Sequence, residues 1–563
     1  MEKSKSTKII LATLVTLVIA AIGFYFLLPA INPYSQEFWI YLLALILIWG
    51  AAYLVIGGGF KNVFVMNSRE KKKKGALKDS PFKYVLIVAA VPLAVLIIGN
   101  LISSTFFNAV AYSEIIDVKE AVFEEDMPET DTVTNIALMD SDSAIKIGNR
   151  TLGSLSDVVS QFEVASSYSQ INHKGVPAKV ANLEYVDFFK WMNNRSSGIP
   201  GYVEVDPVNS DAEYVKLEKP LKYVESAYFN EDLNRKIRFE YPTKIFAQSH
   251  FELDDEGNPY YIVPCMAPKI GLFGAMDVKE VIVFNPIDGS HELYSVDNTP
   301  SWIDNVFDGY LASEKYDWHG MYKNGFWNSV VGNKDCKVTT DDFGYIILGD
   351  DVWYFTGVTS ISSDESNIGF IISNARTGEY KFYPVIGAEE YSAMSAAQGE
   401  VQEKGYVASF PSLINVSGEA TYIMVLKDSN GIVKLCALVN VENYSIVATG
   451  SNQTEAKQAY IKLLVENGII EENKEPEPDV KPPVTDDTKT ADITVADIRS
   501  VTVDGNSVIY FADENGVNYK QTVSSDESIM LIAVGDKITV KYSDTDIEKI
   551  KQMSSWSVTA DGE

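Results

Sequence analysis

Three long apolar runs stand near the start of the chain. They cover residues 9–31, 38–58 and 84–103, and none of them contains a charged residue. Each run has about the 20 residues that a helix needs to cross a bilayer, whereas the apolar stretch of a buried soluble helix is shorter. The pattern predicts three transmembrane helices, and therefore membrane lipid as a partner.

Positive charge is distributed unevenly over the segments that flank these runs. Lys3, Lys5 and Lys8 precede the first run, and eight Lys or Arg residues lie between the second and third runs, whereas residues 32–37 contain none. The positive-inside rule predicts that the N-terminus and the basic loop are cytoplasmic. Because the number of crossings is odd, everything after about residue 104 is expected to be extracytoplasmic, in a multi-pass protein of a bacterial cell membrane.

Strand-like and helix-like patterns alternate in the rest of the chain. Residues 104–180 are mixed and predict either a stalk or a small first domain. Residues 181–470 combine short apolar runs, turn signals and helical stretches, which predicts antiparallel strands with intervening helices, an α+β region. An acidic, Pro-rich linker is expected over 471–490. Alternating apolar and polar residues over 491–563 predict a small β-barrel, OB-like or SH3-like.

An internal repeat organises the α+β region. Residues 281–296 align without gaps with residues 370–385, and the two copies share Asn285 and Asn374 at the same position. Each copy is predicted to form a strand, a tight turn that contains Gly, and a second strand. The turn is expected there because Asn and Gly both suit turn geometry. A degenerate third copy covers residues 421–450, and a helix is expected after each copy.

The turn sequences VFNPIDG and ISNARTG resemble the strand–turn element of PepSY-like domains, which are extracytoplasmic α+β modules of bacterial envelope proteins. The resemblance covers residues 260–465. The family usually has Asp where this chain has Asn285 and Asn374. The resemblance implies binding of proteins or peptides rather than catalysis.

Charge and cysteine content narrow the classes of function. The formal net charge is −30, and residues 104–563 carry 36 basic and 73 acidic residues, a net charge of −37. Such a surface repels the phosphate backbone, so no nucleic-acid partner is expected. The number and spacing of the three cysteines (Cys265, Cys336 and Cys436) do not fit a disulfide scaffold or a zinc site. A single disulfide between two of them is left as an alternative. Cys265 and Cys436 lie in apolar strand-like runs and are expected to be buried.

The sequence contains no catalytic signature of the G-x-S-x-G, P-loop or H-E-x-x-H type. Its four histidines are scattered, and its acidic loops lack EF-hand spacing. We therefore predict no catalytic residue, metal or cofactor. The expected function is binding or scaffolding at the bacterial cell envelope, with envelope proteins, peptides or cell-wall glycan as partners. The alternative is an envelope hydrolase that acts on cell-wall or peptide substrates.

Aromatic residues concentrate in DWHGMYKNGFWNS, residues 317–329. This segment lies between the helix expected over 301–316 and the strands of the second repeat copy, which predicts that its tryptophans pack one repeat on the next. Aromatic side chains can also form a platform for sugar rings or peptides. The candidate binding residues are Trp318, His319, Tyr322 and Trp327, and in the hydrolase alternative His319 is the acid or base.

Overall fold

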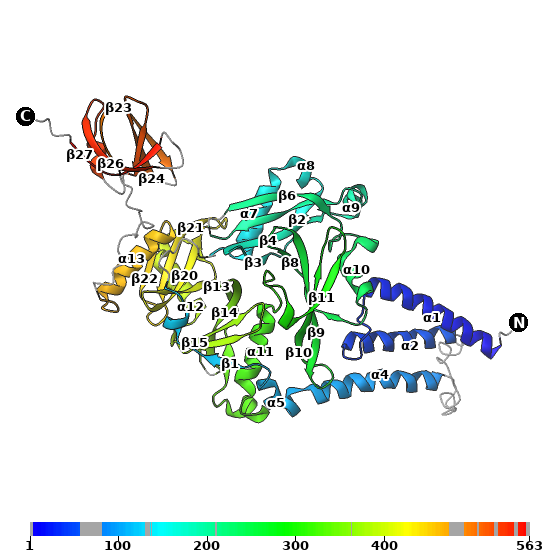
Figure 1. The fold of residues 1–563 in the computed structure, drawn as a ribbon. Helices are drawn as coiled ribbons and strands as arrows, with labels where there is room; N and C mark the ends of the chain where they lie inside the picture. Colours follow the sequence, from blue (N-terminus) through cyan, green and yellow to red (C-terminus); the bar gives the residue numbers. More distant parts are fainter. Residues whose placement is uncertain are drawn as a thin grey trace, which may run out of the picture. The chain divides into compact units, whose positions relative to one another are not determined.

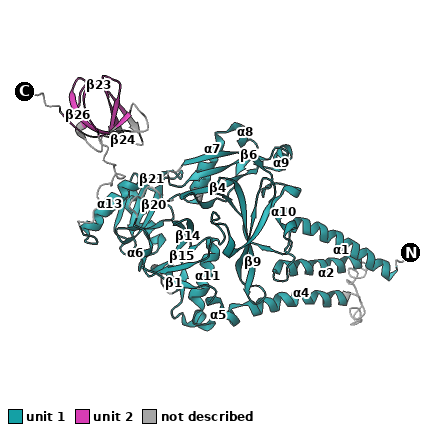
Figure 2. Cartoon of the chain, viewed as in Figure 1, with its two compact units in different colours: residues 1–474 teal, residues 475–563 magenta. Residues whose placement is uncertain are grey.

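In the computed structural model, the chain forms two compact units, residues 1–474 and 475–563 (Figure 2). The residues described are 4–56, 82–129, 136, 138–208, 211–361, 363–471, 489–503, 506–522, 527–544 and 550–558. Residues 57–81, with most of the basic loop, and residues 472–488, with most of the predicted linker, lie outside them. We call residues 104–471 the head.

The three predicted membrane segments are confirmed as helices: α1 (Lys5–Leu27), α2 (Gln36–Ile56) and α4 (Phe82–Ser103). Each is long and apolar enough to span a membrane. α1 packs on α2, and α2 packs on α4. A Cβ on Gly50 would lie 2.7 Å from a methyl carbon of Val85. Glycine therefore lets α2 and α4 approach closely, as small residues commonly do between membrane helices.

Four β-sheets form most of the head (Figure 1). The first contains β2 (Phe162–Val164), β3 (Ser169–His173), β4 (Val176–Tyr185), β5 (Ile199–Asp206) and β6 (Asp211–Leu221). The second contains β7 (Ile245–Phe246), β8 (His250–Leu253), β9 (Pro259–Ile270), β10 (Gly274–Phe284) and β11 (His291–Ser295). The third contains β1 (Val118–Glu120), β12 (Lys337–Thr339), β13 (Gly344–Leu348), β14 (Asp351–Ser360), β15 (Ser363–Asn374), β16 (Tyr380–Tyr383) and β17 (Gly387–Ala388). The fourth contains β18 (Val407–Ala408), β19 (Ser412–Val416), β20 (Glu419–Lys427), β21 (Val433–Asn440) and β22 (Val447–Gly450).

Helices connect and cover these sheets, which confirms a mixed α and β architecture. They are α5 (Thr105–Ser113), α6 (Phe123–Asp126), α7 (Ser141–Gly153), α8 (Ser156–Val159), α9 (Phe188–Asn194), α10 (Leu233–Glu240), α11 (Gly309–Tyr322), α12 (Glu390–Glu400) and α13 (Gln453–Glu466). Among the described strands of these four sheets, the pairs are antiparallel except for β1, which pairs in parallel with β16. This pairing places the segment after α5 at the edge of the third sheet.

The predicted repeat is confirmed at the level of its turns. The side-chain oxygens of Asn285 and Asn374 each accept a backbone N–H from two residues later, at 2.8 and 2.9 Å. Gly289 and Gly378 follow with φ of +80° and +72°, values that favour glycine. In the third copy, the side chain of Asn440 accepts the N–H of Asn443 at 2.7 Å. The helices α11, α12 and α13 follow the three copies, as expected.

The head contacts the membrane helices through α10 and the segment behind it. The Nε of Arg235 donates a hydrogen bond to the backbone oxygen of Tyr25 (3.0 Å), and its guanidinium lies over the Tyr25 ring. In the connection from α1 to α2, the N–H of Ile31 donates to the oxygen of Pro242 (2.8 Å). These contacts join the head to the end of α1.

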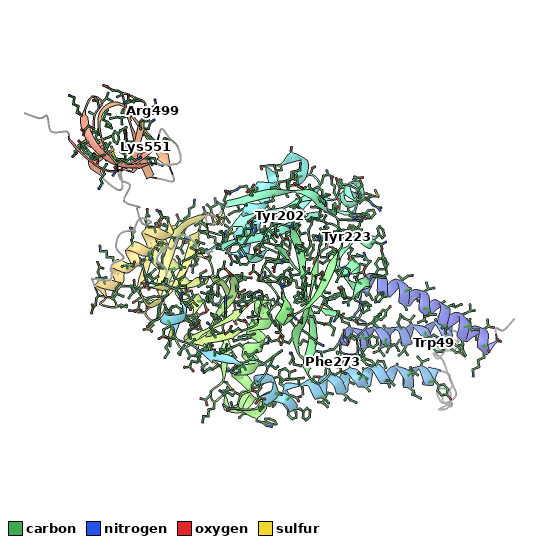
Figure 3. The ribbon with its side chains drawn as sticks, in the orientation of Figure 1. Trp49, Tyr202, Tyr223, Phe273, Arg499 and Lys551 are labelled. Carbon is green, nitrogen blue, oxygen red and sulfur yellow. The ribbon has the colours of Figure 1, made fainter. Side chains whose placement is uncertain are left out.

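A second contact joins the tip of the β9–β10 hairpin to the end of α4. The side-chain oxygen of Ser103 accepts the backbone N–H groups of Leu272 (2.8 Å) and Phe273 (2.9 Å). The Phe273 ring lies against α4 (Figure 3), so close that a Cβ on Gly99 would be 2.3 Å from it. The head therefore lies at the end of the bundle where α1 and α4 finish, and the chain's N-terminus lies at the other end.

Unit 2 is a small β-barrel, as the alternating pattern predicted. Its strands are β23 (Lys489–Val503), β24 (Asn506–Asp513), β25 (Asn518–Thr522), β26 (Lys537–Asp544) and β27 (Ile550–Val558). They close in the order β23–β24–β25–β27–β26, and β25 pairs in parallel with β27. The core of the barrel includes Phe511, Val495 and Val540, which are fully buried or nearly so.

Candidate functional site

Helix α11 carries three of the four predicted binding residues and runs along β10 toward the end of α4. Lys315 contacts Asp277 of β10, and one turn later Trp318 packs in the same cluster as Ala275. Strand β10 starts at the tip of the β9–β10 hairpin, so its residue numbers decrease toward the tip. The residue numbers of α11 increase in that same direction. The C-terminal end of α11 therefore lies beside the hairpin tip that contacts the membrane helix.

The structure corrects the expected position of the helix in this segment. Residues 317–322 belong to α11, which begins at Gly309 and not near residue 301. Gly320 lies inside the helix, where a Cβ would be 2.3 Å from the backbone oxygen of Lys337. Glycine is thus needed for the close approach of β12 and does not end the helix. Asp317 fixes the same contact by accepting the N–H of Thr339 (2.7 Å).

Trp318 and Tyr322 have a packing role at this end of α11. Their rings meet Tyr112 of α5 edge to face, with centroid distances of 5.0 Å for Trp318 and 6.4 Å for Tyr322. The hydroxyl of Tyr112 donates to the backbone oxygen of Ser103 (2.7 Å). This chain of contacts ties α11 through α5 to the last residue of α4.

His319 lies on a different face of α11 and borders a cavity of about 460 Å³. Its Nδ1–H donates to the backbone oxygen of Ser113 (2.8 Å), which leaves Nε2 as the acceptor nitrogen of the neutral ring. Burial lowers the pKa of His319 below its ordinary value. The imidazole is therefore held mostly neutral near pH 7.

Charged groups of both signs line the rest of this cavity. Two lysines stand near His319, and Lys337 lies over the Phe382 ring at 4.8 Å. The polar lining residues are Glu120, Lys323, Asn324, Asp335 and Lys337, with Tyr316 and Phe382 as aromatic neighbours. A lining of both signs can pair with a polar ligand that carries both an anionic and a cationic group.

Trp327 is separate from both the packing cluster and the cavity. Its side chain is 67% exposed, so the expectation that it packs between repeats is wrong. Its ring contacts Phe326 and Phe106, and Phe106 also meets Phe326 at 5.1 Å. The structure thus distributes the four predicted residues over three environments and does not unite them in one site.

The loop that carries Trp327 has an ordered internal structure. Asn328 donates through Nδ2 to the backbone oxygen of Lys334 (2.9 Å) and accepts the N–H of Lys334 (3.2 Å). A single π-helical turn, Asn328–Gly332, follows Trp327. Its C-cap, Asn333, has φ of +47°, a conformation that Asn tolerates. Side chains on this loop are therefore held in defined directions.

Sequence reasoning missed the charged lining of the cavity and the contribution of α5. Lys337 and Glu120 are distant from His319 in sequence and reach it only through β12 and β1. The signal for α5 was available, because Thr105–Ser113 is an uncharged, Phe-containing stretch directly behind the third apolar run. An apolar, aromatic segment directly behind a membrane span is a candidate for the membrane interface.

Two further titratable side chains, Glu252 and Asp304, lie at a junction of the first three sheets, where β3 contacts both β8 and β14. Glu252 of β8 accepts the backbone N–H groups of Asp304 (2.9 Å) and Asn305 (2.8 Å), and Asp304 accepts the N–H of Asn172 (2.7 Å). Both carboxyl groups are buried. Burial raises the pKa of Glu252, and burial together with the charge of Glu252 raises the pKa of Asp304. The pair is enclosed, so it joins sheets and does not face a ligand.

Comparison with known proteins gives little further guidance. No protein-family model matches the sequence, and no curated protein matches it. Among solved structures, the C-terminal domain of YpeB from Bacillus megaterium aligns at 12% sequence identity, covering 41% of this chain and 94% of that chain, with a TM-score of 0.09. This identity and this TM-score do not establish a shared fold.

Proposed function

We propose that the protein is a membrane-anchored binding or scaffolding protein of the bacterial cell envelope. Its head lies outside the cytoplasm and binds peptide-like ligands or envelope proteins. The observation that carries this proposal is the double docking of the head on one end of the helix bundle, at Tyr25 and at Ser103. Docking at two helix ends makes the head a platform fixed to the membrane.

The orientation follows from the charges at the two ends of the bundle. The head contacts the ends of α1 and α4, whereas Lys5 and Lys8 lie in the first turns of α1, at its other end. The sequence that follows α2 contains the eight further basic residues. The positive-inside rule assigns that end to the cytoplasm, and hence the head to the outer side.

Cysteine labelling tests the orientation, because the native cysteines are free and buried. Burial raises the pKa of Cys265 to about 12 and that of Cys436 to about 11, so their thiols react slowly with maleimides. We expect a membrane-impermeant maleimide to label a Tyr444→Cys variant in intact cells, since Tyr444 is an exposed residue of the head.

The matched control is a Lys5→Cys variant at the opposite end of α1. It should be labelled only after the cells are permeabilised. Labelling of the Lys5→Cys variant and protection of the Tyr444→Cys variant in intact cells would overturn the orientation. The unmodified chain measures the background from the three native cysteines.

The finer classification of the two units is also a proposal. The repeated Asn turns at Asn285, Asn374 and Asn440, each followed by a helix, support PepSY-like modules in the head. In unit 2, the strand order and the parallel pair β25–β27 support an OB-like rather than an SH3-like barrel. Neither assignment specifies a ligand, because function depends on the site and not on the fold.

An envelope hydrolase is the second candidate, and the position of His319 at the cavity supports it. Its lowered pKa and its position at the cavity suit a general base. If the protein hydrolyses peptides or wall fragments, a His319→Ala variant should lose turnover while it still binds them. Binding without turnover in the unmodified chain would support the binding role alone.

A further inference from the structure

An exposed apolar surface remains that neither the docking contacts nor the cavity uses. It is formed by two segments more than 200 residues apart, helix α5 and the loop behind α11. We call it the interfacial patch; its members are Phe106, Phe107, Val110, Trp327, Val330 and Val331, with exposed fractions from 46% at Phe106 to 77% at Val331. Monomeric proteins seldom expose such a group of large apolar side chains unless it contacts a partner.

The patch is continuous with the end of a membrane-spanning helix. Only Ser104 separates the last residue of α4 from the first residue of α5. Phe106 of α5 meets both Phe326 and Trp327 of the loop, at 5.1 and 6.0 Å between ring centroids. The loop is therefore held at the level where α4 ends.

We propose that the interfacial patch lies in the headgroup region of the bilayer and anchors the head to lipid. Trp is enriched at membrane–water interfaces, Phe is common on the apolar side of segments that lie there, and α5 adds no charged side chain to the patch over its nine residues. Two exposed lysines flank the apolar part of the loop: Lys334, and Lys323, which also borders the cavity beside His319. Their long side chains can reach lipid phosphates while the apolar groups between them are buried in the interface.

A lipid occupant fits these observations better than a protein occupant. Only Ser104 and Thr105 separate α4 from Phe106, the first residue of the patch, so a bilayer that α4 spans also reaches Phe106 and Phe107. A protein partner would have to compete with lipid for this position. The hydrogen bonds of Asn328 already order this loop. Burial of Val330 and Val331 in the interface therefore requires no further ordering of the backbone.

The proposal requires that α4 spans the bilayer. It does not depend on which side of the membrane the head occupies, nor on what the cavity binds. A failed topology test would therefore leave it intact, and its own failure would leave the proposed function intact.

The test uses the full chain reconstituted into vesicles of phosphatidylcholine and phosphatidylglycerol. An environment-sensitive fluorophore is attached to a Val331→Cys variant and, as a matched control, to a Tyr310→Cys variant. Tyr310 is as exposed as Val331 but lies at the other end of α11, about 18 Å from Tyr322 along the helix axis. Emission wavelength, quenching by lipids spin-labelled near the headgroup, and quenching by iodide are measured.

We expect the fluorophore at position 331 to show blue-shifted emission and strong quenching by the spin-labelled lipids. The fluorophore at position 310 should be quenched mainly by iodide. Equal quenching by iodide at both positions, without lipid quenching at 331, would overturn the proposal. Protection of position 331 from iodide and lipid together would also overturn it, since a second copy or another protein would then cover the patch.

Discussion

The backbone N–H of Phe273 donates a 2.9 Å hydrogen bond to the side-chain oxygen of Ser103, the last residue of α4, across 170 residues of sequence. The same oxygen accepts the N–H of Leu272. A hairpin tip is thus fixed to the end of a membrane-spanning helix. Together with the contact of Arg235 to Tyr25, this bond makes the membrane helices and the head one connected structure.

The two tryptophans of residues 317–329 should respond differently to truncation. Trp318 packs against Tyr112 in a partly buried position, so Trp318→Ala should cost about 2 kcal/mol of unfolding free energy, somewhat less than a fully buried aromatic. Trp327 is mostly exposed, and Trp327→Ala should change stability by less than about 0.5 kcal/mol. Denaturant unfolding of the detergent-solubilised protein measures both values. Equal losses for the two variants would contradict the assigned environments.

A buried ion pair should make a large contribution where α11 meets β10. Lys315 donates to Asp277 at 2.8 Å, and burial lowers the pKa of Lys315. Asp277→Asn leaves this amine without its charge partner and should cost about 3 kcal/mol. The double variant Asp277→Leu with Lys315→Met should recover most of that loss.

The control for the ion pair is Glu466→Gln, which breaks the exposed pair of Glu466 with Lys462 on α13. Exposed pairs contribute little, so its melting temperature should stay nearly unchanged. If the Asp277→Asn variant melts like this control, the pair at Lys315 does not stabilise the head.

Stability of the head should fall as the pH rises, through the carboxyl pair Glu252 and Asp304. Their pKa values are raised in the folded chain, so folding binds protons. The stabilisation is complete below the ordinary carboxyl pKa, near 4, and is lost as the pH rises through the folded values; each pKa unit corresponds to about 1.4 kcal/mol. Melting temperatures between pH 5 and pH 9 measure this loss.

The Asp304→Asn variant isolates the pair from other titrating groups, because an amide keeps an acceptor for the N–H of Asn172 and cannot ionise. Its melting temperature should depend less on pH than that of the unmodified chain. Asp255→Asn, in the exposed turn before β9, is the control and should keep the full dependence. A dependence that is unchanged in the Asp304→Asn variant would show that the pair does not cause it.

Features that depend on local sequence were predictable. The three membrane helices follow from apolar length alone. The repeat follows from Asn285 and Asn374, because an Asn side chain shapes a turn by bonding to backbone only two residues away. The burial of Cys265 and Cys436 followed from their apolar neighbours and is confirmed.

Features that depend on distant contacts were not predictable. The helix was expected to end at residue 316, and only the approach of Lys337 explains why a glycine lies at position 320, inside α11. Trp327 was expected to pack between repeats, but it is mostly exposed, and its ring contacts Phe106, a residue more than 200 positions away. The pairing of Val118–Glu120 with β16 is likewise invisible in the sequence, since three residues carry no strand period.

The docking of the head on the membrane helices is the central claim, and cross-linking tests it most directly. The rings of Phe24 on α1 and Phe239 on α10 meet edge to face, with centroids 5.5 Å apart. A Phe24→Cys/Phe239→Cys variant, with a protease site inserted within residues 57–81, is treated with a short bis-maleimide and then cleaved. We predict that the two fragments stay covalently joined in this variant and separate in a Phe24→Cys/Tyr444→Cys control. Separation of the fragments in both variants would contradict a head docked on the membrane bundle.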